Sequence, residues 1–155
     1  MNARLRILAV GTRMPGWVQA GFEEYRKRLP REWALELREI PLARRGADAA
    51  RAVREEGEAL LAALEGDEHV VAMEVRGRAL ATPDVAKSLE KAREQGLRLA
   101  FLVGGPDGLS EACRARAREQ WSLSRLTLPH PLVRILLAEQ LYRAWSLLAA
   151  HPYHR

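Results

Sequence analysis

The chain has 155 residues, 48% of them hydrophobic, which suffices for the core of a single domain spanning residues 1–155. A net charge of +5 is compatible with an anionic partner, and the lone cysteine, Cys113, excludes an internal disulfide and a cysteine-based zinc cage. There is no run of about 18 apolar residues for a membrane span and no apolar core of a signal peptide, so we expect a cytoplasmic protein.

Short apolar runs alternate with amphipathic segments along the chain. Strands are expected over residues 5–10, 34–40, 69–73 and 97–103, and a fifth strand or extended loop over residues 121–128. Helices are expected over residues 15–28 and 48–64, from Thr82 onward, from Ser110 to about Arg118, and over residues 131–149. This alternation predicts an α/β fold with a mainly parallel sheet and helices on both faces.

Several residues mark where helices begin and where a ligand would bind. Thr82 and Ser110 are expected to cap their helices, and Pro131 is expected to fill the first position of the last helix. In parallel α/β folds, ligands bind beyond the carboxyl ends of the strands. The positions to inspect are therefore Gly11, Met73, Gly104 and the segment after Trp121.

Common nucleotide and hydrolase fingerprints are missing from the sequence. The segment Gly11–Gly16 begins like a phosphate-binding loop, but Trp17-Val18 stands where Lys and Ser or Thr are required. The run Gly104–Gly108 does not match the dinucleotide fingerprint, and there is no His-Glu-x-x-His or Gly-x-Ser-x-Gly sequence. Neither a nicotinamide cofactor nor a metal ion is expected.

Two segments in the last third have a pattern typical of sites for flat ligands. Gly104-Gly105-Pro106-Asp107-Gly108 follows a strand, where glycines let the backbone approach a ligand closely, although they also suit a tight turn. The segment from Trp121 to Leu128 runs into the corner Pro129-His130-Pro131. Its backbone groups can hydrogen-bond an adenine edge, or the histidine can simply begin a helix.

The C-terminal residues combine aromatic and basic side chains. His151-Pro152-Tyr153-His154-Arg155 follows Trp145, and this mixture favours stacking on single-stranded RNA and contact with its phosphates, whereas an ordinary terminus is frayed. Residues 111–134 hold five arginines and two glutamates, an excess that suits phosphate. Since 22 of the 25 basic residues are arginines, compositional bias is the competing explanation.

Taken together, these segments resemble the ribosomal RNA large subunit methyltransferase H family, pseudouridine N3-methyltransferases of the SPOUT class. The likeness covers essentially the whole chain and depends on the order of the motifs. The matching segments are Val10-Gly11-Thr12 with Met14-Pro15 and Trp17-Val18, Gly104–Gly108, Leu126–Arg134, Glu139–Trp145 and His151–Arg155. Asp107 stands where Glu is also expected, which is a conservative exchange.

The resemblance implies a fold and a reaction that composition does not show. It implies a C-terminal trefoil knot, a homodimer, and S-adenosylmethionine bound in the knotted loops. It also implies methylation of N3 of a pseudouridine in 23S ribosomal RNA, in the large subunit of the assembled ribosome. The residues implied to contact the cofactor are Met73, Gly104, Gly105, Leu123, Ser124, Arg125, Leu126, Thr127 and Leu128.

Methyl transfer to N3 requires loss of its proton, so a base or a group that stabilises the anion is expected. His154 is the first candidate for the base and His130 the second, and Arg143 and Tyr153 complete the expected catalytic set. The tail of one subunit is expected to reach the cofactor of the other.

Substrate RNA is expected to contact Arg134, Arg143, Tyr153 and Arg155. For Arg143, an ion pair with Glu139 one turn earlier on the helix is an equally good explanation. Three other functions stay open: a SPOUT enzyme that acts on tRNA or another nucleotide, a non-catalytic ribosome-associated factor, and a small dehydrogenase or phosphate-binding enzyme. The missing fingerprints disfavour the last of these.

Overall fold

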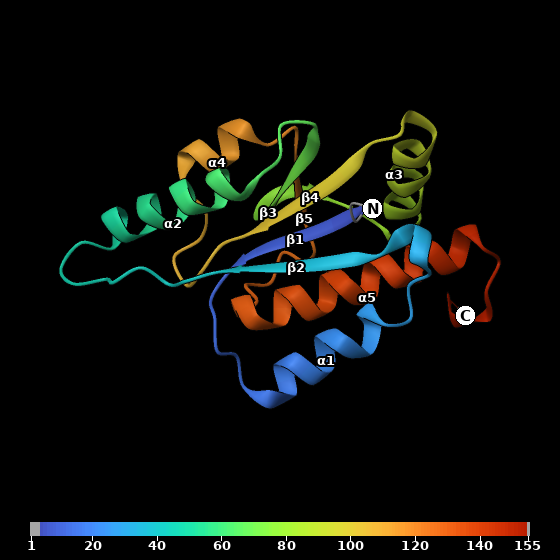
Figure 1. The fold of residues 1–155 in the computed structure, drawn as a ribbon, viewed down its shortest axis with the longest axis horizontal. Helices are drawn as coiled ribbons and strands as arrows, with labels where there is room; N and C mark the ends of the chain where they lie inside the picture. Colours follow the sequence, from blue (N-terminus) through green and yellow to red (C-terminus); the bar gives the residue numbers. More distant parts are fainter. Residues whose placement is uncertain (1–3, 155) are drawn as a thin grey trace.

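The computed structural model describes residues 4–154, and its centre is one sheet of five parallel strands (Figure 1). The strands are β1 (Leu5–Val10), β2 (Leu35–Ile40), β3 (Glu68–Ala79), β4 (Arg98–Val103) and β5 (Glu119–Ser122). They are arranged in the order β2-β1-β4-β3-β5, and every pairing is parallel. β1 and β4 are central strands with apolar side chains on both faces, which explains their continuous apolar sequences.

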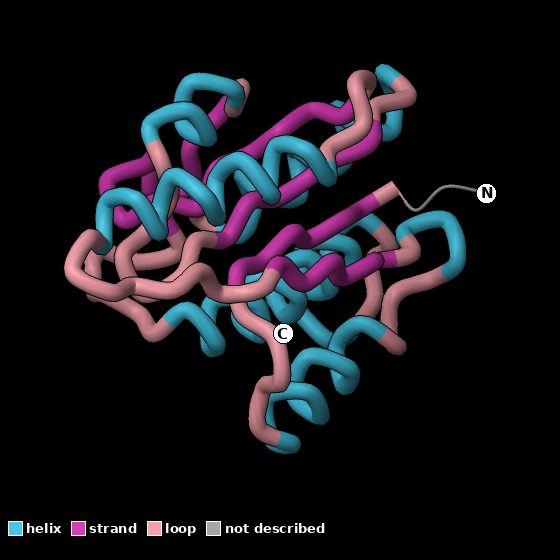
Figure 2. The backbone as a smooth tube through the Cα atoms, turned by 60° about the vertical axis from the view of Figure 1, so that its left-hand side comes forward, coloured by secondary structure: helices cyan, strands magenta, loops and turns pink. Residues whose placement is uncertain are grey.

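Helices cover both faces of the sheet, as Figures 1 and 2 show. The helices are α1 (Gly16–Arg26), α2 (Ala49–Ala63), α3 (Thr82–Gln95), α4 (Glu111–Arg116) and α5 (His130–Leu148). α1, α3 and α5 pack on one face, while α2 and α4 lie together on the other. Short 3₁₀ turns lie at Arg31–Trp33 and Pro152–His154. The α/β architecture expected from the sequence is confirmed.

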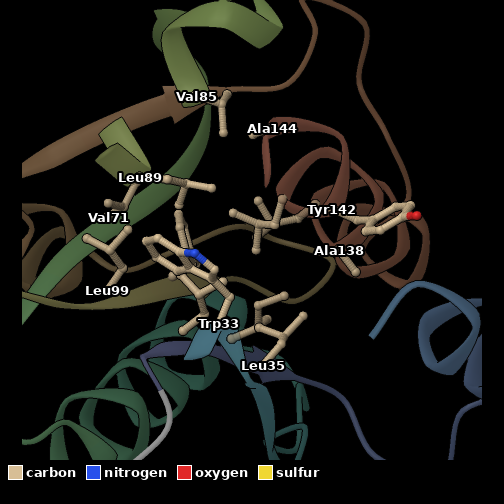
Figure 3. Packing of buried hydrophobic residues seen from close by; sticks show 14 of the residues in the cluster. Trp33, Leu35, Val71, Val85, Leu89, Leu99, Ala138, Tyr142 and Ala144 are labelled. Carbon is tan, nitrogen blue, oxygen red and sulfur yellow. The ribbon is translucent and has the colours of Figure 1, made fainter. Parts of the chain in front are cut away.

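The larger of two apolar cores lies between the sheet and the helices α1, α3 and α5. Trp33 and Leu89 are nearly inaccessible, and they pack in one cluster with Tyr142 and Ala138 of α5 (Figure 3). On the opposite face, Leu60 of α2 and Cys113 of α4 complete a second cluster. α5 is therefore fixed along its length, and this helix carries candidate residues at both ends.

The ends of β3 and β5 differ from those that the sequence pattern predicts. β3 continues past Met73 to Ala79 and pairs twice with β5, so that Met73 and Arg78 both lie opposite Trp121. Residues 74–77 lie between these two pairings and form a bulge. Only one of the four is apolar, so the sequence there lacks the apolar run that predicts a strand. β5 spans only Glu119–Ser122, and the rest of the expected fifth strand is a loop.

Two helix starts also differ from expectation. Thr82 is the first helical residue rather than the cap, because its hydroxyl donates to Gln140 of α5 at 2.8 Å. The carboxylate of Asp84 instead accepts a hydrogen bond from the backbone N–H of Ala81. α5 begins at His130, which moves Pro131 to the second position. Ser110 caps α4 as expected, since its hydroxyl accepts from the N–H of Cys113.

Candidate functional site

The carboxyl ends of three neighbouring strands bring the expected ligand positions to one edge of the sheet. β4 lies between β1 and β3, and the pairs Ala9–Val103 and Ala72–Leu102 set their register. Gly11, Gly104 and Met73 follow these paired residues by one or two positions. This edge is where parallel α/β folds bind ligands.

The loop of residues 123–128 joins β5 to α5 and meets Met73 at this edge. Met73 shares a hollow of about 60 Å³ with four residues of the loop, namely Leu123, Ser124, Leu126 and Leu128. A second hollow of about 220 Å³ lies toward α3 and α5 and shares Leu123, Ser124 and Leu128. Five of the nine expected cofactor residues are thus brought together. Those that line neither hollow are Gly104, Gly105, Arg125 and Thr127.

Two serines shape the loop by hydrogen bonds to its backbone. Ser122 Oγ donates to the carbonyl of Ser124 at 2.8 Å, and Ser124 Oγ accepts from the N–H of Leu126 at 3.0 Å. Within residues 4–154, the backbone N–H groups of Arg125 and Thr127 find no backbone acceptor. The loop therefore combines apolar side chains with free peptide donors, which suits the faces and the edge of a purine.

The glycine turn after β4 needs its glycines for steric reasons. A Cβ on Gly104 would lie 2.5 Å from the carbonyl carbon of Gly108, closer than real Cβ atoms come. Gly108 has a φ of +83°, which favours glycine, and it forms a β-bridge with Gly105. These contacts support the tight-turn explanation, and the same turn also places its backbone beside Met73.

A largely buried ion pair holds this turn, and no sequence motif predicts it. Glu56 of α2 is 3% exposed and lies 2.5 Å from Arg45, which also contacts Asp107 of the turn at 2.9 Å. Glu56 also accepts the N–H of Ala43 at 3.0 Å. Arg45 thus links the β2–α2 connection, α2 and the turn. Neighbouring glutamates on α2 are exposed, so only the fold distinguishes Glu56 from them.

His130 and Arg134 lie one turn apart at the start of α5 and face Gly11. Arg134 is 1% exposed, and its guanidinium contacts Glu39 at 2.6 Å and donates to the Gly11 carbonyl at 3.2 Å. This burial and these contacts indicate a structural role for Arg134 in the free chain, and its contact with RNA phosphate stays a prediction. Burial, followed by the positive charge of Arg134, lowers the pKa of His130, which favours the neutral imidazole near pH 7.

The C-terminal turn folds back along the second half of α5. The Tyr153 phenol donates to Glu139 at 3.0 Å, and Arg143 donates to the same carboxylate and lies 5.0 Å from the Tyr153 ring centre. Burial and the hydrogen bond to Glu139 raise the pKa of Tyr153 to about 12. His154 is half-buried, and its Nδ1 has no hydrogen-bond partner within the described chain. Arg155 lies outside the described residues.

The expected site residues form two groups in a single chain. An α-helix rises about 1.5 Å per residue, so Arg143 lies about 20 Å along α5 from His130. The loop of residues 123–128 is beside His130, and Tyr153 is beside Arg143. The two groups are linked through Gln140, which lines the second hollow and donates at 2.9 Å to Glu139, the carboxylate that accepts the Tyr153 phenol. Neither Arg143 nor Tyr153, however, lines a hollow of the loop. The ion pair of Arg143 with Glu139, expected as the alternative, is present.

Within residues 4–154, no helix has both the length and the apolar character to cross a membrane. That part of the chain also holds no group of three or more His, Cys, Asp or Glu side chains placed to bind a metal ion.

Comparison with known proteins gives matches over nearly the whole chain. A family model described as predicted SPOUT methyltransferase matches residues 3–154. The ribosomal RNA large subunit methyltransferase H of Alkalilimnicola ehrlichii is 60% identical over 154 residues, which are 98% of this chain and 99% of that protein. The protein of the same name from Hahella chejuensis is 57% identical with the same coverage.

Solved structures with low sequence identity share the fold. A probable methyltransferase from Bordetella pertussis has a TM-score of 0.60 at 14% identity, covering 92% of this chain and 94% of that one. The SpoU methyltransferase AviRb from Streptomyces viridochromogenes, solved in complex with AdoMet, has a TM-score of 0.50 at 14% identity. The match covers 92% of this chain and 58% of AviRb.

Proposed function

This chain belongs to the SPOUT methyltransferase family, and from this membership we propose that it transfers methyl groups from S-adenosylmethionine to 23S ribosomal RNA. More narrowly, we propose N3 of a pseudouridine in the large subunit of the assembled ribosome as the acceptor. The relatives named for large-subunit RNA methylation match over 99% of their length, and this full coverage supports the same activity. We propose the cytoplasm as the location of the protein, because its proposed substrate is the ribosome.

The observation that carries the proposal is the shared hollow of Met73 and the loop of residues 123–128. Its walls are apolar, its serines are fixed by hydrogen bonds, and two of its backbone N–H groups lack backbone acceptors within residues 4–154. These features fit an adenosine, and AviRb, which has the same fold, binds AdoMet. The cofactor would supply an electrophilic methyl group bound to a sulfonium. The C-terminal trefoil knot is part of the proposal, because the family resemblance implies it.

The protein's own task is to hold the RNA base and remove its proton. Neutral His130 lies beside the loop and suits a proton acceptor, because burial lowers its pKa. His154 remains a second candidate, with an Nδ1 that has no partner within the described chain. Tyr153 and Arg143 present an aromatic face and a cation together, which suits a base and its phosphate. Arg155, which lies outside the described residues, is proposed as a further phosphate contact.

We propose that the complete site forms across a homodimer. Within one chain, Tyr153 and Arg143 line neither hollow of the loop, so the tail of one subunit would act at the loop of its partner. Trp17 and Leu126 have exposed apolar side chains, which such a contact would bury.

The proposal is tested with ribosomes purified from a strain that lacks the gene. Incubation with the protein and tritiated S-adenosylmethionine is expected to label large-subunit RNA, and mass spectrometry of nuclease fragments is expected to place one methyl group on one pseudouridine. Labelling of tRNA instead would overturn the proposed substrate. Failure of the folded protein to bind the cofactor in calorimetry would overturn the enzymatic function itself.

A further inference from the structure

A furrow of about 880 Å³ lies at the opposite end of the sheet from the candidate cofactor loop. One wall is α3, and the other is formed where β3 and β5 begin, near Glu68 and Glu119. From Glu68 to Met73, β3 extends over about 17 Å at roughly 3.3 Å per residue. Most of the furrow is therefore distant from the loop of residues 123–128, although Trp121 lines the furrow and both hollows of the loop, and the proposed methyl transfer gives the furrow no role.

Five cationic side chains line the furrow from both walls. Lys87 and Lys91 are one turn apart on α3 and are exposed, and they are two of the three lysines in the chain. Arg78, Arg116 and Arg118 line the other wall. Within residues 4–154, none of the five is within ion-pair distance of a carboxylate, whereas sixteen ion pairs exist elsewhere in that range.

Two acidic groups of the furrow already have partners. Asp67 pairs with Arg98, and Glu68 is held by Arg6 at 2.7 Å. Although burial raises the pKa of Glu68, its hydrogen bonds from Arg6 and from the backbone outweigh burial and lower it, so Glu68 is ionised and engaged.

The remaining two carboxylates accept hydrogen bonds but have no Lys or Arg partner within the described chain, so two negative charges remain against the five positive ones. Glu119 accepts hydrogen bonds from Trp121 at 3.0 Å and pairs with His69 at 2.7 Å. Asp84 accepts the N–H that precedes α3. The positive charges of the furrow are consequently in excess and are left for an external anion.

The floor of the furrow indicates which part of a nucleic acid it suits. Trp121 is 2% exposed, so it offers no face on which a base stacks, and Ala92 and Leu99 are buried. Cations on two walls above such a floor suit phosphate oxygens, and contacts to phosphate carry no sequence information.

We propose that this furrow is a second RNA contact, which grips the phosphate backbone of the ribosomal RNA away from the methylated nucleotide. The inference rests on the proposed function, since it takes ribosomal RNA as the substrate. The furrow would contribute affinity and orientation, independent of sequence.

The test compares two double variants that each remove two positive charges from an exposed helix. Lys87→Ala with Lys91→Ala removes both lysine charges from the α3 wall of the furrow. Arg51→Ala with Arg54→Ala is the matched control on α2, on the other face of the sheet. Binding to purified ribosomes is measured over a series of salt concentrations. Cofactor affinity and thermal unfolding of each variant show whether it is folded.

Each phosphate contact contributes about 0.7 to 0.9 to the slope of log affinity against log salt. The lysine variant is expected to lower this slope by between one and two and to weaken ribosome binding about tenfold at low salt. The control is expected to change neither. If the folded lysine variant binds with the wild-type slope and affinity, the furrow is not an RNA contact. If the wild-type protein itself neither binds nor methylates ribosomes, the proposed function fails instead.

Discussion

The carboxylate of Glu139 accepts a hydrogen bond from the phenol of Tyr153, with 3.0 Å between the two oxygens. This contact joins the C-terminal turn to the middle of α5 and places the Tyr153 ring under the guanidinium of Arg143. One carboxylate therefore positions both groups that we propose to meet the RNA. Burial, and after it the hydrogen bond to Glu139, raises the pKa of the Tyr153 phenol to about 12.

Tyr153→Phe is expected to change how stability depends on pH. The folded-state pKa of Tyr153 is about 12 and the ordinary value is 10.0, so the contribution of Tyr153 is complete below pH 10 and is lost as the pH rises toward 12. At neutral pH the free energy of unfolding of the variant should be lower by about 1 kcal/mol, because it lacks a partly exposed hydrogen bond to a charged group. The variant should also lose less stability than the wild type between pH 10 and 12. Denaturant unfolding at several pH values measures both, with Tyr25→Phe as control.

Gly104→Ala is expected to weaken cofactor binding without unfolding the protein. The new methyl group would lie within 3 Å of the Gly108 carbonyl, so the turn must shift. Gly66→Ala is a matched control, because nothing lies within 4 Å of its Cβ position. Calorimetry should show at least a tenfold loss of affinity, about 1.4 kcal/mol, for the first variant only. Equal affinity in the two variants would remove the turn from the cofactor site.

His130→Ala tests which histidine takes the proton. If His130 is the base, the acid limb in the pH profile of wild-type kcat/KM should have its midpoint below pH 6.5, because burial and the charge of Arg134 lower the pKa of His130. The variant should lose about 10²-fold or more in kcat and lose that limb. Persistence of the limb in His130→Ala, together with its loss in His154→Ala, would assign the role to His154.

The sequence predicts the architecture well because the apolar runs of β1 and β4 report burial directly. It also predicts the edge at which Met73 meets the loop of residues 123–128, since parallel topology alone sets that edge. It did not predict the roles of Arg134 and Glu56. A charged residue that is buried by pairing with a distant segment has no local signature, and Arg134 and Glu39 are far apart in the chain.

Arg134→Met is expected to destabilise the fold rather than affect RNA binding. The substitution removes the partner of Glu39 and the hydrogen bond to the Gly11 carbonyl. Breaking a fully buried pair costs about 3–5 kcal/mol, and because Glu39 is a third exposed we expect about 2 kcal/mol. Urea unfolding measures this loss. Wild-type stability combined with weak ribosome binding would instead identify Arg134 as a phosphate contact.

Mixed dimers decide whether the tail acts across the subunit interface. One variant carries Gly104→Ala, and the other ends at Pro152 and so lacks Tyr153 and His154. With S-adenosylmethionine kept well below the Kd of the Gly104→Ala protein, each homodimer is expected to be nearly inactive on ribosomes, the first for want of cofactor and the second for want of the tail. If the tail serves the partner, each mixed dimer has one complete site, and refolding an equal mixture should restore about a quarter of wild-type activity. If the tail serves its own chain, no subunit in the mixture has both parts, and activity stays at the level of the homodimers.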